Sequence, residues 1–357
     1  MPRAPWLRFF ACLLLGGVAV WVALAAWIML APLSVLGFDE VQVLAATALL
    51  ERCDPVRVVV FGDSRPIFGI DPGSLDTSVV ILAEGNASPV VDQYRLQQRL
   101  ACARKPDLVI LSYILPAFVR VNANGFWTNG AFTHGLGLDE QWAVMRAVAP
   151  GLFQPMQTDA AETYAELPFG LKTVLYRSYF PVFYGPSVLN AQQTGLRSRL
   201  ESNERVRDLI MAGHGHLEGR MAATWPEAAL DVGLPDGGMN RVIDADLRHM
   251  LDLLAGRGIR SLLLLMPVNE ATYAGIPASA RAAVMGSLQA LIERYPLTRL
   301  ADRDLPHWPD RFFGDLYMHM NKAGTAAVSA ILNACLPGEL DRSGPGCSLA
   351  EPGGEAR

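Results

Sequence analysis

The sequence predicts an α/β domain in which a parallel β-sheet lies between layers of helices, preceded by one transmembrane helix. Three observations lead to this fold class. Short β-branched runs alternate with amphipathic helical segments, the pattern of a parallel sheet with helices on both faces. One long uncharged stretch lies at the N-terminus. The composition, 51% hydrophobic and 18% charged over 357 residues, is that of a globular protein.

Composition and charge also exclude several classes of protein. A net charge of −5 without long basic runs argues against a nucleic-acid binder. Five cysteines are too few for a small protein built on disulfides. A polytopic membrane protein is excluded because only one stretch is long and apolar enough to span a bilayer. The length fits one large domain, or one domain with a sizeable insertion.

The uncharged N-terminal stretch covers residues 9–38, which is 30 consecutive positions. A bilayer needs about 20 apolar residues, whereas the apolar part of a cleaved signal peptide has about 7–15. We therefore expect an uncleaved transmembrane anchor. Cleavage at the small residues Ala23–Ala26 is the alternative.

The charges that flank this stretch predict its orientation. Arg3 and Arg8 precede it, and Asp39 and Glu40 follow it. Because positive residues stay on the cytoplasmic side, we expect residues 1–8 in the cytoplasm. The remaining chain is then periplasmic or extracellular, held by a single pass through the inner membrane.

The cysteines agree with export. Four of them, Cys53, Cys102, Cys335 and Cys347, lie outside the apolar stretch, an even number that permits two disulfides in an oxidising compartment. We expect the pairs Cys53–Cys102 and Cys335–Cys347, with four buried thiols as the alternative. No cysteine and histidine spacing is typical of a zinc site.

The elements follow in order. The first part predicts a helix over 40–54, strands over 56–61, 79–82 and 108–114, and a helix over 89–104. Residues 116–240 lack a strand pattern and are expected as an insertion over the ligand edge of the sheet, with helical stretches at 159–166 and 196–212. The last part predicts helices over 243–256, 278–295 and 321–336, and strands over 260–266 and 297–301. The tail, 337–357, is rich in Gly, Pro and Glu and is expected to be disordered.

The first chemically suggestive block is Gly62-Asp63-Ser64, at the C-terminal end of the first strand. Ligand sites in open parallel sheets lie at that edge. Gly62 allows a sharp turn, and Ser64 then projects at the strand–helix junction, where a serine can attack an acyl carbon. The alternative is that Asp63 or Ser64 only caps the following helix.

The second block precedes the last helix and contains Asp315 and His319. A serine nucleophile needs a base, usually histidine, and a carboxylate that orients the imidazole. One loop can supply both groups. The alternative is a surface histidine beside an aspartate in a turn.

Together the two blocks resemble the SGNH (GDSL-like) hydrolase superfamily, whose serine block is Gly-Asp-Ser and whose last block is Asp-x-x-His. The chain looks most like its membrane-anchored bacterial branch, related to polysaccharide O-acetylation proteins of the alginate and cellulose type. The matching letters are Gly-Asp-Ser-Arg at 62–65, Gly-Ile-Asp-Pro at 69–72, and the segments 84–89, 105–110 and 265–267. The resemblance covers roughly residues 55–120 and 243–335 of the sequence. It implies a three-layer, flavodoxin-like parallel sheet.

The resemblance also implies roles for individual residues. Ser64 is expected as the nucleophile, His319 as its base and Asp315 as the partner of the histidine. The backbone N–H groups of Ser64 and Gly85 are expected to form the oxyanion hole, with Asn86 as a candidate side-chain donor.

The chain departs from the family pattern in two places. The spacing from Asp315 to His319 is one residue longer, which leaves Asp310, Asp304 and Asp302, or a bulged loop, as alternatives. The third block, Gly-x-Asn-Asp, is absent, and Tyr113-Ile-Leu-Pro116 stands in its place. Loss of one oxyanion donor costs about 10²–10³ in rate, and Asn122 or Asn124 are candidates to compensate.

Within the insertion, residues 122–129 combine amides with aromatic side chains, including Asn122 and Trp127. Such a patch suits sugar binding. The alternative is a loop rich in turns with a tucked tryptophan.

These observations lead to two expected functions. The first is an exported, membrane-tethered serine esterase or O-acyltransferase that acts on acyl, foremost acetyl, esters of a cell-envelope or extracellular glycan through acyl-Ser64. A transferase implies a polytopic membrane protein as acyl donor, and neither version calls for a metal or an organic cofactor. The second is a catalytically weak scaffold or binding subunit of an envelope polysaccharide assembly. An esterase for lipids is a third interpretation.

Overall fold

The computed structural model describes residues 5–119, 136–148, 191–218, 238–315, 319–341 and 346–350. Most of the expected insertion lies outside these residues, including the helical stretch expected at 159–166.

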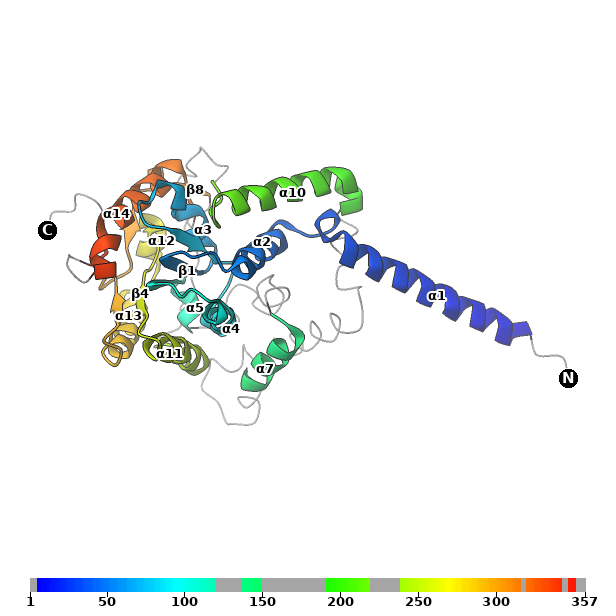
Figure 1. Ribbon diagram of the computed structural model, residues 1–357, viewed down its shortest axis with the longest axis horizontal. Coiled ribbons are helices and arrows are strands. Elements are labelled where there is room, and N and C mark those ends of the chain that lie inside the picture. The colour runs from blue at the N-terminus through cyan, green and yellow to red at the C-terminus, as the bar shows by residue number, and fades with distance from the viewer. Residues whose placement is uncertain are drawn as a thin grey trace.

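A five-stranded parallel sheet forms the centre of the domain (Figure 1). Its strand order is β2-β1-β3-β4-β6, and every neighbouring pair is parallel. The strands are β1 (Val58–Gly62), β2 (Val79–Ile81), β3 (Leu108–Ser112), β4 (Arg260–Leu263) and β6 (Thr298–Leu300). Each overlaps a segment that the sequence predicts as a strand, so the α/β class with a parallel sheet is confirmed. The inner three strands are buried over almost their whole length, which explains their continuous apolar runs.

Helices cover both faces of this sheet. The helices α3 (Ser64–Gly69) and α14 (Lys322–Asp341) lie above it in Figure 1, whereas α4 (Pro89–Ala101), α11 (Arg241–Ala255) and α13 (Ala278–Ile292) lie below it. The helix α11 buries one apolar face, with Leu247, Met250, Leu251 and Leu254.

The apolar N-terminal stretch is divided between a helix and the folded domain. The helix α1 (Pro5–Leu30) is long and apolar enough to cross a membrane and extends away from the rest of the molecule (Figure 1). It ends before Pro32, which begins the short 3-10 helix η1 (Pro32–Ser34). Our expectation of an anchor over 9–38 is therefore wrong at its C-terminal end. Leu33 and Leu36 are buried in the domain core, so this end belongs to the domain.

The connection between α1 and the domain is packed rather than loose. The helix α2 (Phe38–Arg52) follows η1, and α10 (Leu196–Ala212) packs along both. The side-chain amide of Asn203 on α10 donates to the carbonyl oxygens of Leu33, at 2.8 Å, and Leu36, at 2.9 Å. Both α2 and α10 confirm helices that the sequence predicts.

Two disulfides join Cys53 to Cys102 and Cys335 to Cys347, with Cα–Cα distances of 5.6 and 5.0 Å. Both pairs confirm the pairing expected from the sequence. The first bond ties the end of α2 to the end of α4.

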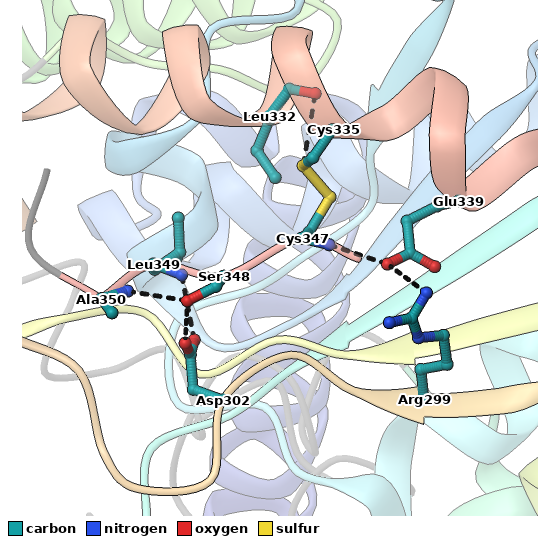
Figure 2. Close-up of a disulfide and its surroundings, with 9 residues drawn as sticks. All are labelled: Arg299, Asp302, Leu332, Cys335, Glu339, Cys347, Ser348, Leu349 and Ala350. Atoms are coloured by element: carbon teal, nitrogen blue, oxygen red, sulfur yellow. Dashed lines mark hydrogen bonds and ion pairs between the residues drawn. A yellow bond between two sulfur atoms is a disulfide. The ribbon is translucent and has the colours of Figure 1, made fainter. Parts of the chain in front are cut away.

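The C-terminal segment corrects the expectation of a disordered tail from residue 337. The helix α14 continues to Asp341, and Cys347 is bonded to it (Figure 2). The Cys347 N–H donates to Glu339 at 2.8 Å, and the Leu349 N–H donates to Asp302 at 3.0 Å. Leu349 is fully buried, so a disulfide and a buried side chain hold this segment on the domain despite its composition.

Several elements have no counterpart among the expectations. Apart from α7, each has six residues or fewer, which is too short for a clear periodic pattern. They are η2 (Pro72–Ser74), α5 (Pro116–Val119), α7 (Leu138–Val148), β5 (Val268–Asn269), α12 (Glu270–Gly275), β7 (His307–Trp308), η6 (Asp310–Phe312), β8 (Phe313–Asp315) and β9 (His319–Met320). The helix α7 is longer but lies between segments without a clear pattern. The antiparallel pair of β8 and β9 is important because it carries His319.

Candidate active site

The structure brings together the two residues that the sequence singles out. The Ser64 Oγ lies 2.8 Å from the His319 Nε2, although 255 positions separate them in the sequence. Ser64 is the first residue of α3, directly after β1, and His319 is the first residue of β9, which packs against α3. Both residues are half-buried. The pair therefore lies at the carboxyl edge of the sheet, where ligands of open α/β folds bind.

Gly62 makes the sharp turn from β1 to Ser64 possible. Its φ of +147° is a conformation that side chains rarely adopt. A Cβ at this position would lie 1.8 Å from the carbonyl oxygen of Ser112 on β3. The close approach of β1 and β3 thus requires a glycine here.

Asp63 caps α3, since its Oδ1 accepts the Arg65 N–H at 2.9 Å. Asp63 therefore has the capping role that we considered as an alternative. Ser64 does not cap the helix, and its hydroxyl lies beside His319. The Asp63 carboxylate also pairs with the buried Arg65 guanidinium at 3.1 Å and accepts the Ile114 N–H at 2.6 Å. Arg65 in turn donates to the carbonyl of Met266 at 3.1 Å. These contacts tie the serine turn to the segments that follow β3 and β4.

The imidazole of His319 packs against Phe68 of α3, with a distance of 4.4 Å between ring centroids and an angle of 43°. In the hairpin, Asp315 is the backbone partner of His319, and a bulge in β8 between Phe313 and Asp315 produces this register. The side chain of Asp315 lies outside the described part of the structure.

The three alternative aspartates are engaged elsewhere. Asp310 accepts a hydrogen bond from Asn269 at 3.0 Å, and Asp304 accepts one from Tyr273 at 2.7 Å. Asp302 holds the C-terminal segment, as Figure 2 shows. These contacts give each of the three a structural role, and Asp315 remains the candidate partner of His319.

The loop after β2 presents Gly85 beside the serine turn. The Glu84 N–H donates to the carbonyl of Gly62 at 3.0 Å, and the Ala87 N–H closes a turn onto Glu84 at 3.1 Å. Asn86 holds a φ of +59° at the third position of this turn, a conformation that Asn tolerates better than most residues. Among the described residues, neither the Ser64 N–H nor the Gly85 N–H donates to a protein acceptor. Within that part of the structure, both donors are available to an oxyanion.

A buried network of ionisable side chains, which sequence reasoning missed, stabilises this loop. Arg95 of α4 pairs with Glu84 at 2.7 Å and donates to the carbonyl of Leu82 at 2.7 Å. Asp92 accepts the Tyr113 hydroxyl at 2.7 Å. Burial raises the pKa of Glu84 to about 8 and that of Asp92 to about 7, although Arg95 opposes both shifts. The spacing of Asp92 and Arg95, three residues apart on one helix, is the sequence signal for this network.

Tyr113 stands where the Gly-x-Asn-Asp block of the SGNH pattern is expected and is absent. It is fully buried and bonded to Asp92. Its hydroxyl is therefore part of the support of the fold. Asn122, Asn124 and Trp127, considered as compensating donors or sugar-binding residues, lie outside the described residues.

Two residues of α2 also lie beside the site, and no pattern in the sequence indicates a role for them. A Cβ built on Gly85 would lie 3.3 Å from the Gln42 Oε1 and 3.8 Å from the Asp39 Oδ1. Asp39 is exposed as a residue, yet desolvation of its carboxylate raises its pKa, and the charge of His319 opposes that shift.

Within the described residues, no group of three His, Cys, Asp or Glu side chains could hold a metal ion. The arrangement of a hydroxyl, an imidazole and two backbone donors is suited to nucleophilic attack on an acyl carbon. No protein-family model matches the chain, and no curated protein matches it in sequence.

Proposed function

We propose that this protein is an SGNH-type serine esterase or O-acyltransferase, exported and tethered to the membrane, which acts on acyl esters of a cell-envelope glycan. The observation that carries the proposal is the contact of 2.8 Å between the Ser64 Oγ and the His319 Nε2. The N–H groups of Ser64 and Gly85, which donate to no acceptor among the described residues, support it as well.

The fold supports the same family. The strand order β2-β1-β3-β4-β6 is the order of flavodoxin-like doubly wound sheets. In such sheets the ligand binds where the chain reverses the direction in which it adds strands, beside the first strand. Ser64 lies directly after β1, at that point.

The reaction follows from the geometry. His319 takes the proton of Ser64 while the Oγ attacks the acyl carbon, and the N–H groups of Ser64 and Gly85 bind the negative oxygen. His319 then gives the proton to the leaving alcohol, which leaves acyl-Ser64. In the second half, water or a sugar hydroxyl attacks the acyl carbon, His319 takes its proton, and Ser64 Oγ leaves with that proton. Water as acceptor makes an esterase, and a sugar makes a transferase.

The location of the domain belongs to the proposal as well. Arg3 and Arg8 before α1 favour a cytoplasmic N-terminus and an exported domain. The two disulfides favour an oxidising compartment such as the periplasm. A transferase on that side needs a polytopic membrane protein that delivers acyl groups.

One observation favours the second candidate function, a catalytically weak scaffold of a glycan assembly. The asparagine of the third family block is absent, and Tyr113 in its place is bonded to Asp92. The site then has one oxyanion donor fewer, which costs about 10²–10³ in rate.

Hydrolysis of p-nitrophenyl acetate by the full chain in detergent separates the two functions. We expect steady release of p-nitrophenol, and a fall of about 10²-fold or more in both Ser64→Ala and His319→Ala. Equal rates in all three proteins would favour the scaffold.

A further inference from the structure

The first turn of α2 faces the candidate oxyanion loop with two hydrogen-bond acceptors. Asp39 and Gln42 are three residues apart and so share one side of the helix. An oxygen of each lies within 3.8 Å of the position that a Cβ of Gly85 would occupy. The helix that follows the membrane span therefore forms one wall of the site.

Of these two residues, Gln42 gives the stronger evidence for a bound ligand. Its side chain is 2% exposed, and its Oε1 accepts no hydrogen bond from any described residue. Buried amide oxygens are nearly always paired, because an unpaired one costs about 1–3 kcal/mol. A buried, unpaired acceptor directed at Gly85 thus points to a ligand that supplies the donor.

Asp39 adds a carboxylate to this acceptor surface, and the charge of His319 opposes the desolvation that raises the pKa of this carboxylate. A carboxylate and an amide oxygen side by side are suited to the adjacent hydroxyl groups of a polyol, since each hydroxyl has one O–H to donate.

We propose that Gln42 and Asp39 form a subsite that holds the hydroxyl groups of a polyol acyl acceptor, such as a sugar unit, beside acyl-Ser64. The subsite rests on the proposed function. One acceptor hydroxyl attacks the acyl carbon and gives its proton to His319, and the bond from that carbon to the Ser64 Oγ breaks as the Oγ takes the proton. The neighbouring hydroxyls bind Gln42 and Asp39.

The position of the subsite limits where the acceptor can be. Asp39 is nine residues beyond Leu30, the last residue of α1. Even an extended chain of that length covers only about 30 Å, and the packed η1 covers less. The acceptor is therefore held close to the membrane surface.

The test measures how the acyl-enzyme partitions between acceptors. The full chain in detergent receives p-nitrophenyl acetate together with either methyl β-D-glucopyranoside or methanol, and the ratio of new ester to free acetate is measured by mass spectrometry. The variants are Gln42→Met, which keeps the side-chain length, and Asp39→Asn. Gln97→Met on an exposed face of α4 is the matched control.

We expect the ester ratio with the glucoside to fall about five- to tenfold in Gln42→Met and in Asp39→Asn, while the ratio with methanol and both ratios in Gln97→Met stay at the parent values. Equal losses with glucoside and methanol would assign Gln42 to oxyanion binding or to the fold, and would overturn the subsite. Unchanged ratios would overturn it as well. If the parent and Ser64→Ala release p-nitrophenol at the same rate, the proposed function itself fails, and the subsite with it.

Discussion

Replacing Gly62 with alanine is expected to destabilise the domain and to displace the Ser64 hydroxyl. The new Cβ would lie 1.8 Å from the carbonyl oxygen of Ser112, which is about 1.5 Å closer than a carbon and an oxygen normally approach. The obstacle is backbone of the central strand β3, so the turn that carries Ser64 must move. The φ of +147° adds strain to the clash.

The two effects together cost about 3 kcal/mol or more of the free energy of unfolding. A shift of the hydroxyl by about 1 Å costs about 10² in rate, because attack needs close alignment with the acyl carbon. Urea unfolding measures the first effect, and the rate of p-nitrophenyl acetate hydrolysis measures the second.

A second glycine provides a matched control. Gly258 also has a positive φ, +68°, but nothing lies within 4 Å of the position of its Cβ. Gly258→Ala is expected to cost about 1 kcal/mol from backbone strain alone and to keep the parent rate. If Gly62→Ala is as stable and as active as Gly258→Ala, the close approach of β1 and β3 does not position Ser64, and the reasoning is refuted.

Three further predictions concern Glu84, the connection between α1 and the domain, and the C-terminal disulfide. Burial raises the pKa of Glu84 to about 8, so the folded protein holds a proton that the unfolded chain loses from about pH 4.5. The free energy of unfolding should therefore fall as the pH rises from about 4.5 to 8, by up to about 1.4 kcal/mol per pH unit. Glu84→Gln should reduce this slope, whereas the exposed control Glu51→Gln should keep it. If both variants have the slope of the parent, Glu84 does not hold a proton in the folded protein. Asn203→Ala removes two hydrogen bonds from the connection to α1 and should cost about 1–3 kcal/mol in urea unfolding, whereas no loss would show that the connection is not held there. Cys335→Ser removes the disulfide between two cysteines 12 positions apart and should lower the free energy of unfolding by about 3 kcal/mol under oxidising conditions. If the variant is less stable than the parent by the same amount under reducing conditions, where neither protein has this disulfide, the loss does not come from the disulfide.

The sequence predicts the sheet because buried parallel strands are short β-branched runs, and such runs are visible locally. Val58–Gly62 and Leu108–Ser112 are examples. Ser64 could be predicted because Gly62-Asp63-Ser64 stands at the end of a parallel strand, where ligands bind. His319 could be predicted from the block that contains it, because a serine nucleophile needs a base, and the hairpin of β8 and β9 that carries it leaves no pattern in the sequence. Both disulfides match the pairs that we expected, although four cysteines also allow two other pairings.

The rest depends on contacts between distant segments that leave no local pattern. Asp39 has the sequence position of a charge that ends a membrane span, and only the fold brings it to Gly85 and His319. The C-terminal segment has the composition of a disordered tail, but the bond at Cys347 and the burial of Leu349 hold it. The apolar run from residue 9 does not indicate that Leu33 and Leu36 belong to the domain core, except that Pro32 ends the helix before them.

Covalent labelling tests the central claim, that Ser64 is a nucleophile activated by His319, most directly. The full chain is treated with an alkyl fluorophosphonate, and the modified peptide is identified by mass spectrometry in the parent, Ser64→Ala and His319→Ala. We expect complete labelling on Ser64 in the parent, no label in Ser64→Ala, and labelling slowed by about 10²–10⁴ in His319→Ala. A folded parent that remains unlabelled, or a label that persists in Ser64→Ala, would contradict it.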